Sequence, residues 1–458
     1  MKRIVSILLV FALSALCIGC KSKSHSSFTG SEGGQNSLWV VVDLRQESME
    51  SDLSSDVAVF RDSVEYVLGE DIEEVVFECI PPEGAERDTA IDRIRLEIMS
   101  GGGPDVFIVQ CDNLWEPMLF QMPEKAMGLD LFLPLDEYIE NAELAEWDKF
   151  TQSVMEAGRD DEGQQLVPLS YLLPAAMYRE SDVSHTPKQM KWEDMQNDEA
   201  LQDAVVRLGA GFDSTGEWDF PIEYLLGELA DYKAEELLFT EDELLDHVNT
   251  IIELTDYYEE NAYAEKEYST KTHLGLWFNL SGGTAHGPSG TYDVSRGGGR
   301  LNGLTEQDPL TLVPFYSDDG GNTAVITAFA AVNRNTRRPE DAFKVIDLFM
   351  STDRQTNSTM FAYHIYSYVG MPMHEEVMSQ KYEMRVNAVS NSWFSLDDNN
   401  FQKVCAVRDQ ITVAQFSGAL NAELENMMVN CYGAHLNGED YTKLVHEAYE
   451  AMEQMMAE

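Results

Sequence analysis

Short apolar blocks alternate with longer stretches of helical periodicity in the first part of the sequence. Residues 38–42 form an apolar block rich in valine, which is typical of a strand buried on both faces. Farther on, Val57, Phe60 and Val64 recur at helical spacing between acidic residues. In chain order the pattern predicts a strand at 38–42, a helix at 54–68, a strand at 75–77, a helix at 87–99 and a strand at 105–109. This alternation predicts right-handed crossovers and a mainly parallel sheet.

The first twenty residues follow the order of a bacterial export signal. A short basic start precedes an apolar run at 4–15, which is too short for a membrane-spanning helix of about 20 residues. Residues 16–20 read Leu-Cys-Ile-Gly-Cys and resemble a lipobox, with Cys17 in place of the usual leucine. The resemblance implies a signal peptide over residues 1–19 and acylation of Cys20 after cleavage.

The next segment differs from the rest of the chain in composition. Residues 20–36 are rich in Ser, Gly and Lys and show no apolar periodicity, which predicts a flexible tether. No later stretch reaches the roughly 18 uninterrupted apolar residues of a membrane helix. We therefore expect a body in water, held to the extracytoplasmic face of the cell membrane by its lipid.

The charge balance is strongly acidic. The 458 residues include 81 acidic and 31 basic side chains, for a formal net charge of -50. Such a charge argues against a nucleic-acid partner, because phosphates would be repelled. The acids are spread along the whole chain, which favours a solvated acidic surface, and a preference for a cationic or neutral ligand is the alternative. The length is too great for one ordinary core and favours two lobes.

The cysteines and histidines are not spaced as in known catalytic or metal-binding motifs. The cysteines beyond Cys20 have neither zinc nor thiol-redox spacing, and three pairings among them are open. They are Cys79, Cys111, Cys405 and Cys431. The sequence lacks the motifs of phosphate-binding loops, zinc proteases and serine hydrolases, and its 9 histidines are dispersed. We therefore expect no catalytic activity, no metal and no cofactor.

Five motifs follow one another along the chain. They are Gly-Gly-Gly-Pro-Asp-Val-Phe at 101–107, Leu-Phe-Leu-Pro-Leu-Asp-Glu-Tyr-Ile at 131–139, Gly-Gln-Gln-Leu-Val-Pro-Leu-Ser-Tyr at 163–171, an apolar strand and a helix at 324–351, and a helix after Gly438. In this order they resemble segments of the extracellular solute-binding proteins of the sugar-binding family (family 1 type), lipoprotein components of ABC transporters. One departure is Arg179, which stands near the position where the family has Asn. The acidic stretch 188–263 matches no family segment.

The resemblance implies an α/β fold of the periplasmic-binding-protein-like class, with two α/β lobes joined by a hinge and a ligand cleft between them. It places the first lobe at 37–165 plus about 312–360, and the second at 166–311 plus about 361–458. The ligand would lie where strand ends of the two lobes face each other. Ligand binding would stabilise a closed form, which the permease recognises.

Residues that directly follow predicted strands are the candidate ligand contacts. Trp115 and Trp277 are the candidate aromatic platforms, because a sugar presents apolar C–H faces beside its hydroxyl groups. Packing is the alternative role for the tryptophans, and a turn or cap is the alternative for the polar residues. The further candidates are Asp112, Asn113, Tyr171, Asn279, Tyr316 and Asp318.

These observations predict an extracytoplasmic solute-binding lipoprotein that delivers a carbohydrate to an ABC importer by hinge closure. The expected partners are a sugar or oligosaccharide, the permease subunits of the importer, and the membrane through the lipid anchor. The protein is expected to act as a monomer. A surface-attached carbohydrate-active enzyme and a sensory lipoprotein are the alternatives, and the sequence does not name the solute.

Overall fold

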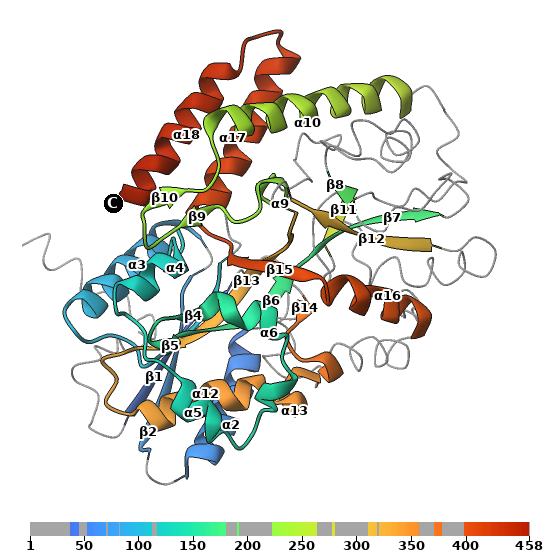
Figure 1. The fold of residues 1–458 in the computed structure, drawn as a ribbon. Coiled ribbons are helices and arrows are strands. Elements are labelled where there is room, and N and C mark those ends of the chain that lie inside the picture. Colours follow the sequence, from blue (N-terminus) through green and yellow to red (C-terminus); the bar gives the residue numbers. More distant parts are fainter. Residues whose placement is uncertain are drawn as a thin grey trace, which may run out of the picture.

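The computed structural model shows two separate clusters of buried apolar side chains, one around a seven-stranded sheet and one among helices (Figure 1). We call them the first core and the second core. The described residues are 37–44, 53–69, 72–81, 83–111, 117–179, 190–191, 222–262, 277–279, 310–317, 320–356, 371–377 and 398–457.

Three parallel strands begin the first core, as the sequence predicts. They are β1 (Ser37–Asp43), β2 (Glu74–Cys79) and β3 (Val106–Gln110), connected by helices α2 (Leu53–Leu68) and α3 (Gly84–Met99). β1 lies between β2 and β3 and pairs in parallel with both. Nearly all residues of β1 and β3 are buried, as expected of strands covered on both faces. The two crossovers run in opposite directions along the sheet, so α2 and α3 cover opposite faces (Figure 1).

The rest of the first sheet is built around one long strand, β13 (Asn322–Val332), all of whose residues are buried. β3 pairs antiparallel with its C-terminal half, and β15 (Ile411–Phe416) pairs in parallel with its N-terminal half. On the other edge, β6 (Leu166–Leu172) pairs antiparallel with β13 and also carries β14 (Met371–Pro372). Segments from both ends of the chain therefore share one core.

A second sheet of four short strands continues from the first. Its order is β11 (Trp277–Asn279), β7 (Pro174–Arg179), β12 (Leu310–Tyr316) and β8 (Met190–Lys191). β6 begins where the sequence places the start of the second lobe, but it belongs to the seven-stranded sheet. The chain enters the second sheet only at Pro174. The lobe boundaries drawn from the sequence stay a prediction.

Helices form the second core. They are α9 (Glu223–Leu226), α10 (Glu241–Ala262), α17 (Ala419–Leu436) and α18 (Thr442–Ala457). α17 and α18 form a hairpin, and α10 packs against both (Figure 1). Val445, Ala448 and Met452 recur at helical spacing on α18 and are buried. A small hairpin of β9 (Ala230–Asp231) and β10 (Glu236–Leu237) packs against α18.

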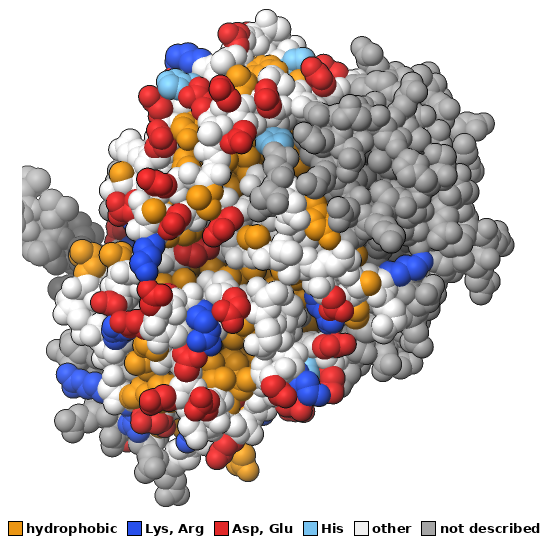
Figure 2. Space-filling view, viewed as in Figure 1, with side chains coloured by type: hydrophobic (Ala, Val, Ile, Leu, Met, Phe, Trp, Pro, Cys, Tyr) orange, Lys and Arg blue, Asp and Glu red, His pale blue; other side chains and the backbone are white. Residues whose placement is uncertain are grey.

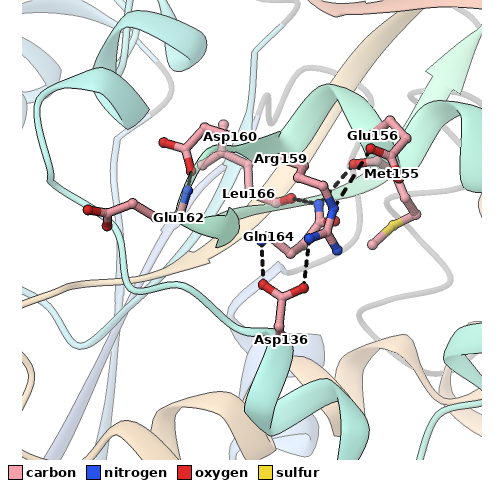
Figure 3. Close-up of polar contacts among 8 residues, drawn as sticks. All are labelled: Asp136, Met155, Glu156, Arg159, Asp160, Glu162, Gln164 and Leu166. Carbon is pink, nitrogen blue, oxygen red and sulfur yellow. Dashed lines mark hydrogen bonds and ion pairs between the residues drawn. The ribbon is translucent and has the colours of Figure 1, made fainter.

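Two of the sequence motifs meet at one corner of the first core (Figure 3). The Asp136 carboxylate accepts hydrogen bonds from Arg159 Nη1 at 2.7 Å and from the backbone N–H of Gln164 at 2.8 Å. A Cβ at Gly163 would lie 1.9 Å from Asp136 Oδ2, and φ there is 131°, so only glycine fits. These motif residues therefore fix the local fold at this corner.

Helix α12 (Pro339–Met350) carries a buried carboxylate, Asp347, and packs against α2. The carboxylate accepts three backbone N–H groups, from Glu143 at 3.1 Å and from Leu144 and Ala145 at 3.0 Å. Trp147 Nε1 donates a fourth hydrogen bond at 2.9 Å. Asp347 therefore fixes the loop before Trp147 against α12.

The remaining described elements are short. They are α4 (Pro123–Gly128), α5 (Asp136–Glu140), η2 (Trp147–Lys149), α6 (Gln152–Met155), η3 (Glu156–Gly158), β4 (Arg159–Asp160), β5 (Gly163–Gln164), α13 (Thr352–Thr356) and α16 (Asp398–Arg408). On the surface, acidic side chains are scattered over the face seen in Figure 2 and do not gather into one patch.

Candidate functional site

In the described part of the chain, two crossings connect strands of the two sheets, and a third leads from α16, beside the second sheet, into the first sheet. β6 leads into β7 through Leu173, which is completely buried. β12 leads into β13 through a tight turn, in which the backbone N–H and the Oγ of Ser317 both donate to the carbonyl of Gly321 at 2.9 Å. α16 packs against β12 and leads into β15. Short crossings of this kind are the segments that absorb rotation when two parts of a protein hinge.

A clasp formed by residues 407–412 ties two of these crossings together. Tyr316, the last residue of β12, donates its hydroxyl to Gln410 Oε1 at 2.8 Å. Asn322, the first residue of β13, donates its backbone N–H to Thr412 Oγ1 at 2.8 Å and its Nδ2 to the carbonyl of residue 407 at 3.3 Å. The connection between α16 and β15 is therefore bonded to both sides of the turn between β12 and β13.

The clasp also lies beside the remaining crossing, through Tyr171 near the end of β6. Tyr171 is completely buried, and burial raises the pKa of its hydroxyl to about 12. The Tyr171 hydroxyl has no hydrogen-bond partner among the described residues, and the nearby charge of Arg408 opposes the rise. Arg408 is itself paired with Asp409, with 2.8 Å between Nη2 and Oδ1. Residues 407–412 are therefore bonded to the crossing between β12 and β13, and the charge of Arg408 acts on Tyr171 near the crossing between β6 and β7.

One buried arginine bonds to the chain at the carboxyl ends of all three parallel strands. Arg87 on α3 pairs with Asp43 at the end of β1, with 2.7 Å from Nη1 to Oδ1 and 3.2 Å from Nη2 to Oδ2. Its Nη1 also donates to the carbonyl of Pro81, after β2, at 3.1 Å, and its Nε donates to the carbonyl of Pro117, beyond β3, at 2.9 Å. One guanidinium thus contacts the chain beyond each strand. Ligands of open α/β sheets bind at this edge.

A second arginine of α3 and the end of β3 complete this edge. Arg95 donates from Nη2 to the carbonyl of Met118 at 2.6 Å and from Nε to that of Leu119 at 3.1 Å. Cys111, directly after β3, donates its backbone N–H to the carbonyl of Thr327 at 2.7 Å. Cys111 and the carbonyls of Met118 and Leu119 are therefore bonded to the first core.

Half of the predicted ligand residues lie in the described part of the chain. Trp277 and Asn279 begin and end β11, and their backbones pair with Ala176 and Pro174 of β7, just beyond the first crossing. Tyr171 and Tyr316 face the clasp, as described above. Outside the described residues lie Asp112, Asn113, Trp115, Asp318 and the predicted lipid-bearing Cys20. The structure brings Tyr171, Tyr316 and β11 to one junction, and their contact with a ligand stays a prediction.

The described residues form no metal-binding cluster and no membrane-spanning helix. No group of three or more potential metal ligands converges among them, and none of their helices has the length and apolar character to cross a bilayer. All four described cysteines are free thiols. Burial raises the pKa of Cys79 to about 11 and that of Cys431 to about 12, so these two thiols are protonated at neutral pH.

Sequence reasoning missed the residues that organise this region, namely Arg87, Arg95 and Gln410. A signal for Arg87 was present, because it shares helical spacing with Ile91, Ile94 and Ile98 and so falls on the buried stripe of α3. An arginine on an apolar stripe predicts a buried partner, and Asp43 at the end of a buried strand is the matching acid. Gln410 lies in a short turn and gives no such signal.

Comparison with solved structures identifies the fold. The chain is similar to the sugar-binding protein MalE from Xanthomonas citri, with a TM-score of 0.54 and 14% identity over 92% of this chain and 97% of that chain. It is similar to an extracellular solute-binding protein family 1 from Alicyclobacillus acidocaldarius, with a TM-score of 0.53 and 12% identity over 92% and 98% of the two chains. It is also similar to a periplasmic oligogalacturonide binding protein from Yersinia enterocolitica, with a TM-score of 0.53 and 10% identity over 92% of this chain and 99% of that chain.

Neither the known family models nor the curated proteins match this sequence. The likeness to solved structures is one of fold, and it covers nearly the whole length of each chain. The protein therefore has the periplasmic-binding-protein-like α/β fold of the extracellular solute-binding proteins. This confirms, at the level of the fold, the resemblance that the five sequence motifs indicate.

Proposed function

We propose that this protein captures a carbohydrate between its two sheets, outside the cytoplasm, and passes it to an ABC importer. The observation that carries the proposal is the clasp, which bonds the connection between α16 and β15 to both sides of the β12–β13 turn, in a fold whose parallel strands offer their carboxyl edge to a ligand. Rotation about the crossings moves one sheet toward that edge, and a ligand that contacts both parts stabilises the closed form. Binding and release need no covalent step.

The fold neighbours support a carbohydrate as the solute. One is a sugar-binding protein, and another is described as an oligogalacturonide binding protein. We propose that Trp115 and Trp277 stack on the sugar from opposite sides. The hydroxyl groups of the sugar would be bound by Asp112, Asn113, Asn279 and Asp318. Tyr171 and Tyr316 would complete the site from the crossings.

The N-terminal residues support a lipid-anchored position on the outer face of the membrane. We propose that Cys20 is acylated after removal of residues 1–19, and that residues 20–36 separate the folded body from the membrane. Metabolic labelling with a fatty acid should mark the protein, whereas the Cys20→Ser variant should be released or left unprocessed. A mature N-terminus well downstream of Cys20, without lipid, would contradict the anchor.

Thermal melts with a panel of sugars test the binding function. The panel consists of maltotriose, cellotriose, chitotriose and trigalacturonic acid, each added over a range of concentrations. A binding protein should melt at a higher temperature, in a saturable manner that follows RT ln(1 + [L]/Kd), and the sugar should be recovered intact. Cleavage products would favour an enzyme, and melts unchanged by every sugar would count against a carbohydrate as the solute.

A further inference from the structure

A short connection in the described part of the chain, which we call the joint, runs from the first core to the second core. It comprises residues 415–421, from the end of β15 to the first turn of α17. Phe416 belongs to the first core, whereas Leu420 belongs to the second core. Any change in the contacts of the joint therefore changes how firmly the two cores are held together.

Backbone and side-chain bonds fix the joint from both sides. The Gln415 side chain accepts the backbone N–H of Leu229 at 3.1 Å and donates to the carbonyl of Gly227 at 2.9 Å. Ala419 donates its N–H to the carbonyl of Gln121 at 2.8 Å. The approach is so close that a Cβ at Gly418 would lie 2.7 Å from that same carbonyl oxygen. The joint has no room to move without breaking these contacts.

Helix α4 also contacts the joint, and its charged residues bond to both cores. Glu124 Oε1 accepts the backbone N–H of Phe416 at 2.8 Å. Next to it, Lys125 Nζ donates to the carbonyls of Met455 and Met456, at the end of α18, at 3.2 and 2.8 Å. A helix of the first core is therefore bonded to the joint through Glu124 and to the second core through Lys125.

The carboxyl group of Glu124 is only half satisfied. Its Oε2 is buried and has no hydrogen-bond partner. The titratable groups that act on it from the packed segment before α10 are the acid Glu228 and the hydroxyl of Tyr232, and neither is a cation. Burial raises the pKa of Glu124 to about 7, Glu228 adds to the rise, and the Phe416 N–H opposes it. The cation of the same helix, Lys125, is engaged by the end of α18.

We propose that Glu124 makes the joint sensitive to protons: the neutral acid packs α4 against the joint, whereas the ionised carboxylate, although a stronger acceptor for the Phe416 N–H, draws water to its unpartnered Oε2 and loosens the packing of α4 there. An ionised Glu124 would be a buried charge with a free oxygen and an acid for a neighbour, which is the arrangement that proteins avoid. The shift from 4.5 to about 7 corresponds to ionisation disfavoured by about two to three powers of ten in this structure. Loosening is therefore expected as the pH rises through neutrality.

A second buried acid at the same joint provides a matched control. Glu223 lies near Asn421, whose Oδ1 accepts the N–H of Gly418 at 3.0 Å. Burial raises the pKa of Glu223 to about 7 as well, with Glu425 adding to the rise, but it is not bonded to Phe416. The Glu223→Gln variant therefore changes the charge of the joint without touching the contact between α4 and Phe416.

The direct test needs no ligand. The backbone amide shift of Phe416 is followed by ¹⁵N NMR from pH 5 to pH 9 in the intact chain, together with the exchange protection of the Ala419 amide. Wild type and Glu223→Gln should show a step in the Phe416 shift near pH 7, and Ala419 protection should fall at least about threefold across it. Both changes should vanish in Glu124→Gln. A Phe416 shift without this step, or with the same step in Glu124→Gln, would overturn the proposal.

The consequence for binding rests on the proposed function, because the clasp leads into β15 at one end of this strand and the joint leaves it at the other. The dissociation constant of whichever panel sugar gives the largest thermal shift should rise at least about threefold between pH 6 and pH 8. In Glu124→Gln it should stay constant. A constant value in wild type would limit the proton effect to the joint and contradict its link to binding. If no panel sugar binds, the proposed binding function is contradicted. The amide measurement still tests whether the joint responds to pH.

Discussion

Two buried carboxylates, at the carboxyl edge of the sheet and at the joint, stand in opposite situations. Asp43 has a guanidinium on both oxygens, whereas Glu124 has one backbone N–H on one oxygen and nothing on the other. Burial raises the pKa of both groups, but Arg87 counteracts the rise at Asp43, and the acid Glu228 adds to it at Glu124.

The comparison shows how burial can serve two purposes in one molecule. At the edge, a charge is buried with its partner, so the strand ends are fixed at neutral pH. At the joint, a carboxyl group is buried without a cation, so the contact depends on whether it is protonated. We expect the edge to be rigid and the joint to respond to pH.

The largest effect is expected from breaking the pair at the edge. Arg87→Met should lower the free energy of unfolding by about 3–5 kcal/mol, because it leaves Asp43 as an unpaired buried charge. The double variant Asp43→Asn with Arg87→Met removes both charges and should regain a large part of this loss. Urea unfolding at pH 7 measures both. Equal losses in the single and double variants would show that the charge pair is not the cause.

The joint should give the next largest effect, through pH. Because the folded-state pKa of Glu124 lies near 7 and its ordinary value is 4.5, the folded chain keeps a proton that the unfolded chain loses between these values. Stability should therefore be greatest below pH 4.5 and fall until about pH 7, by about 3 kcal/mol for this group. Glu124→Gln should remove that share of the slope. Denaturation at pH 5, 6, 7 and 8 measures it, and a slope unchanged in the variant would contradict the assignment.

A third buried carboxylate extends the comparison to a group satisfied by N–H donors alone. Asp347→Asn should cost about 2 kcal/mol, because an amide turns its own N–H groups toward some of the four donors that Asp347 accepts. The exposed Asp353, changed to Asn, is the control and should have almost no effect. Thermal melts measure the melting temperatures of both variants. Equal changes in melting temperature would mean that the four donors tolerate an amide at position 347.

The smallest effect is expected at the clasp. Tyr316→Phe removes the hydrogen bond to Gln410 and should cost about 0.5–1.5 kcal/mol. Tyr66→Phe, at a side chain that is 87% exposed, should cost nothing measurable. Urea unfolding of the two variants compares them directly. A loss at Tyr316 no larger than at Tyr66 would leave the clasp without energetic support.

The sequence predicts the parallel part of the fold because that part is local. β1, β2, β3 and their helices follow one another, and each has its own periodicity. The long-range part was not predictable in this way. β13 is uniformly apolar, so its pattern says that it is buried but does not say that β6, β3 and β15 are its neighbours. The family resemblance, and not the periodicity, indicated a return of the chain to the first sheet.

The candidate site was predictable only in part. The sequence places Trp277 and Tyr316 beside strand-like blocks, and in the structure Trp277 begins β11 and Tyr316 ends β12. Their role in ligand binding stays a prediction. The buried partners were not predictable from such blocks. Arg87 lies on the apolar stripe of α3 and so carries a sequence signal, whereas Glu124 looks like an ordinary surface residue in a chain with so many acids. Only the folded packing distinguishes a paired charge from an unpaired one.

Solution scattering with and without sugar tests the central claim most directly, namely that a solute closes the two sheets about the clasped crossings. The panel sugar with the largest thermal shift is added to saturation at pH 6, and the radius of gyration of the intact chain is compared with that of the free protein. We expect a smaller radius with the sugar bound, and a graded decrease that follows the binding curve. A radius that stays constant while the sugar binds to saturation would contradict hinge closure.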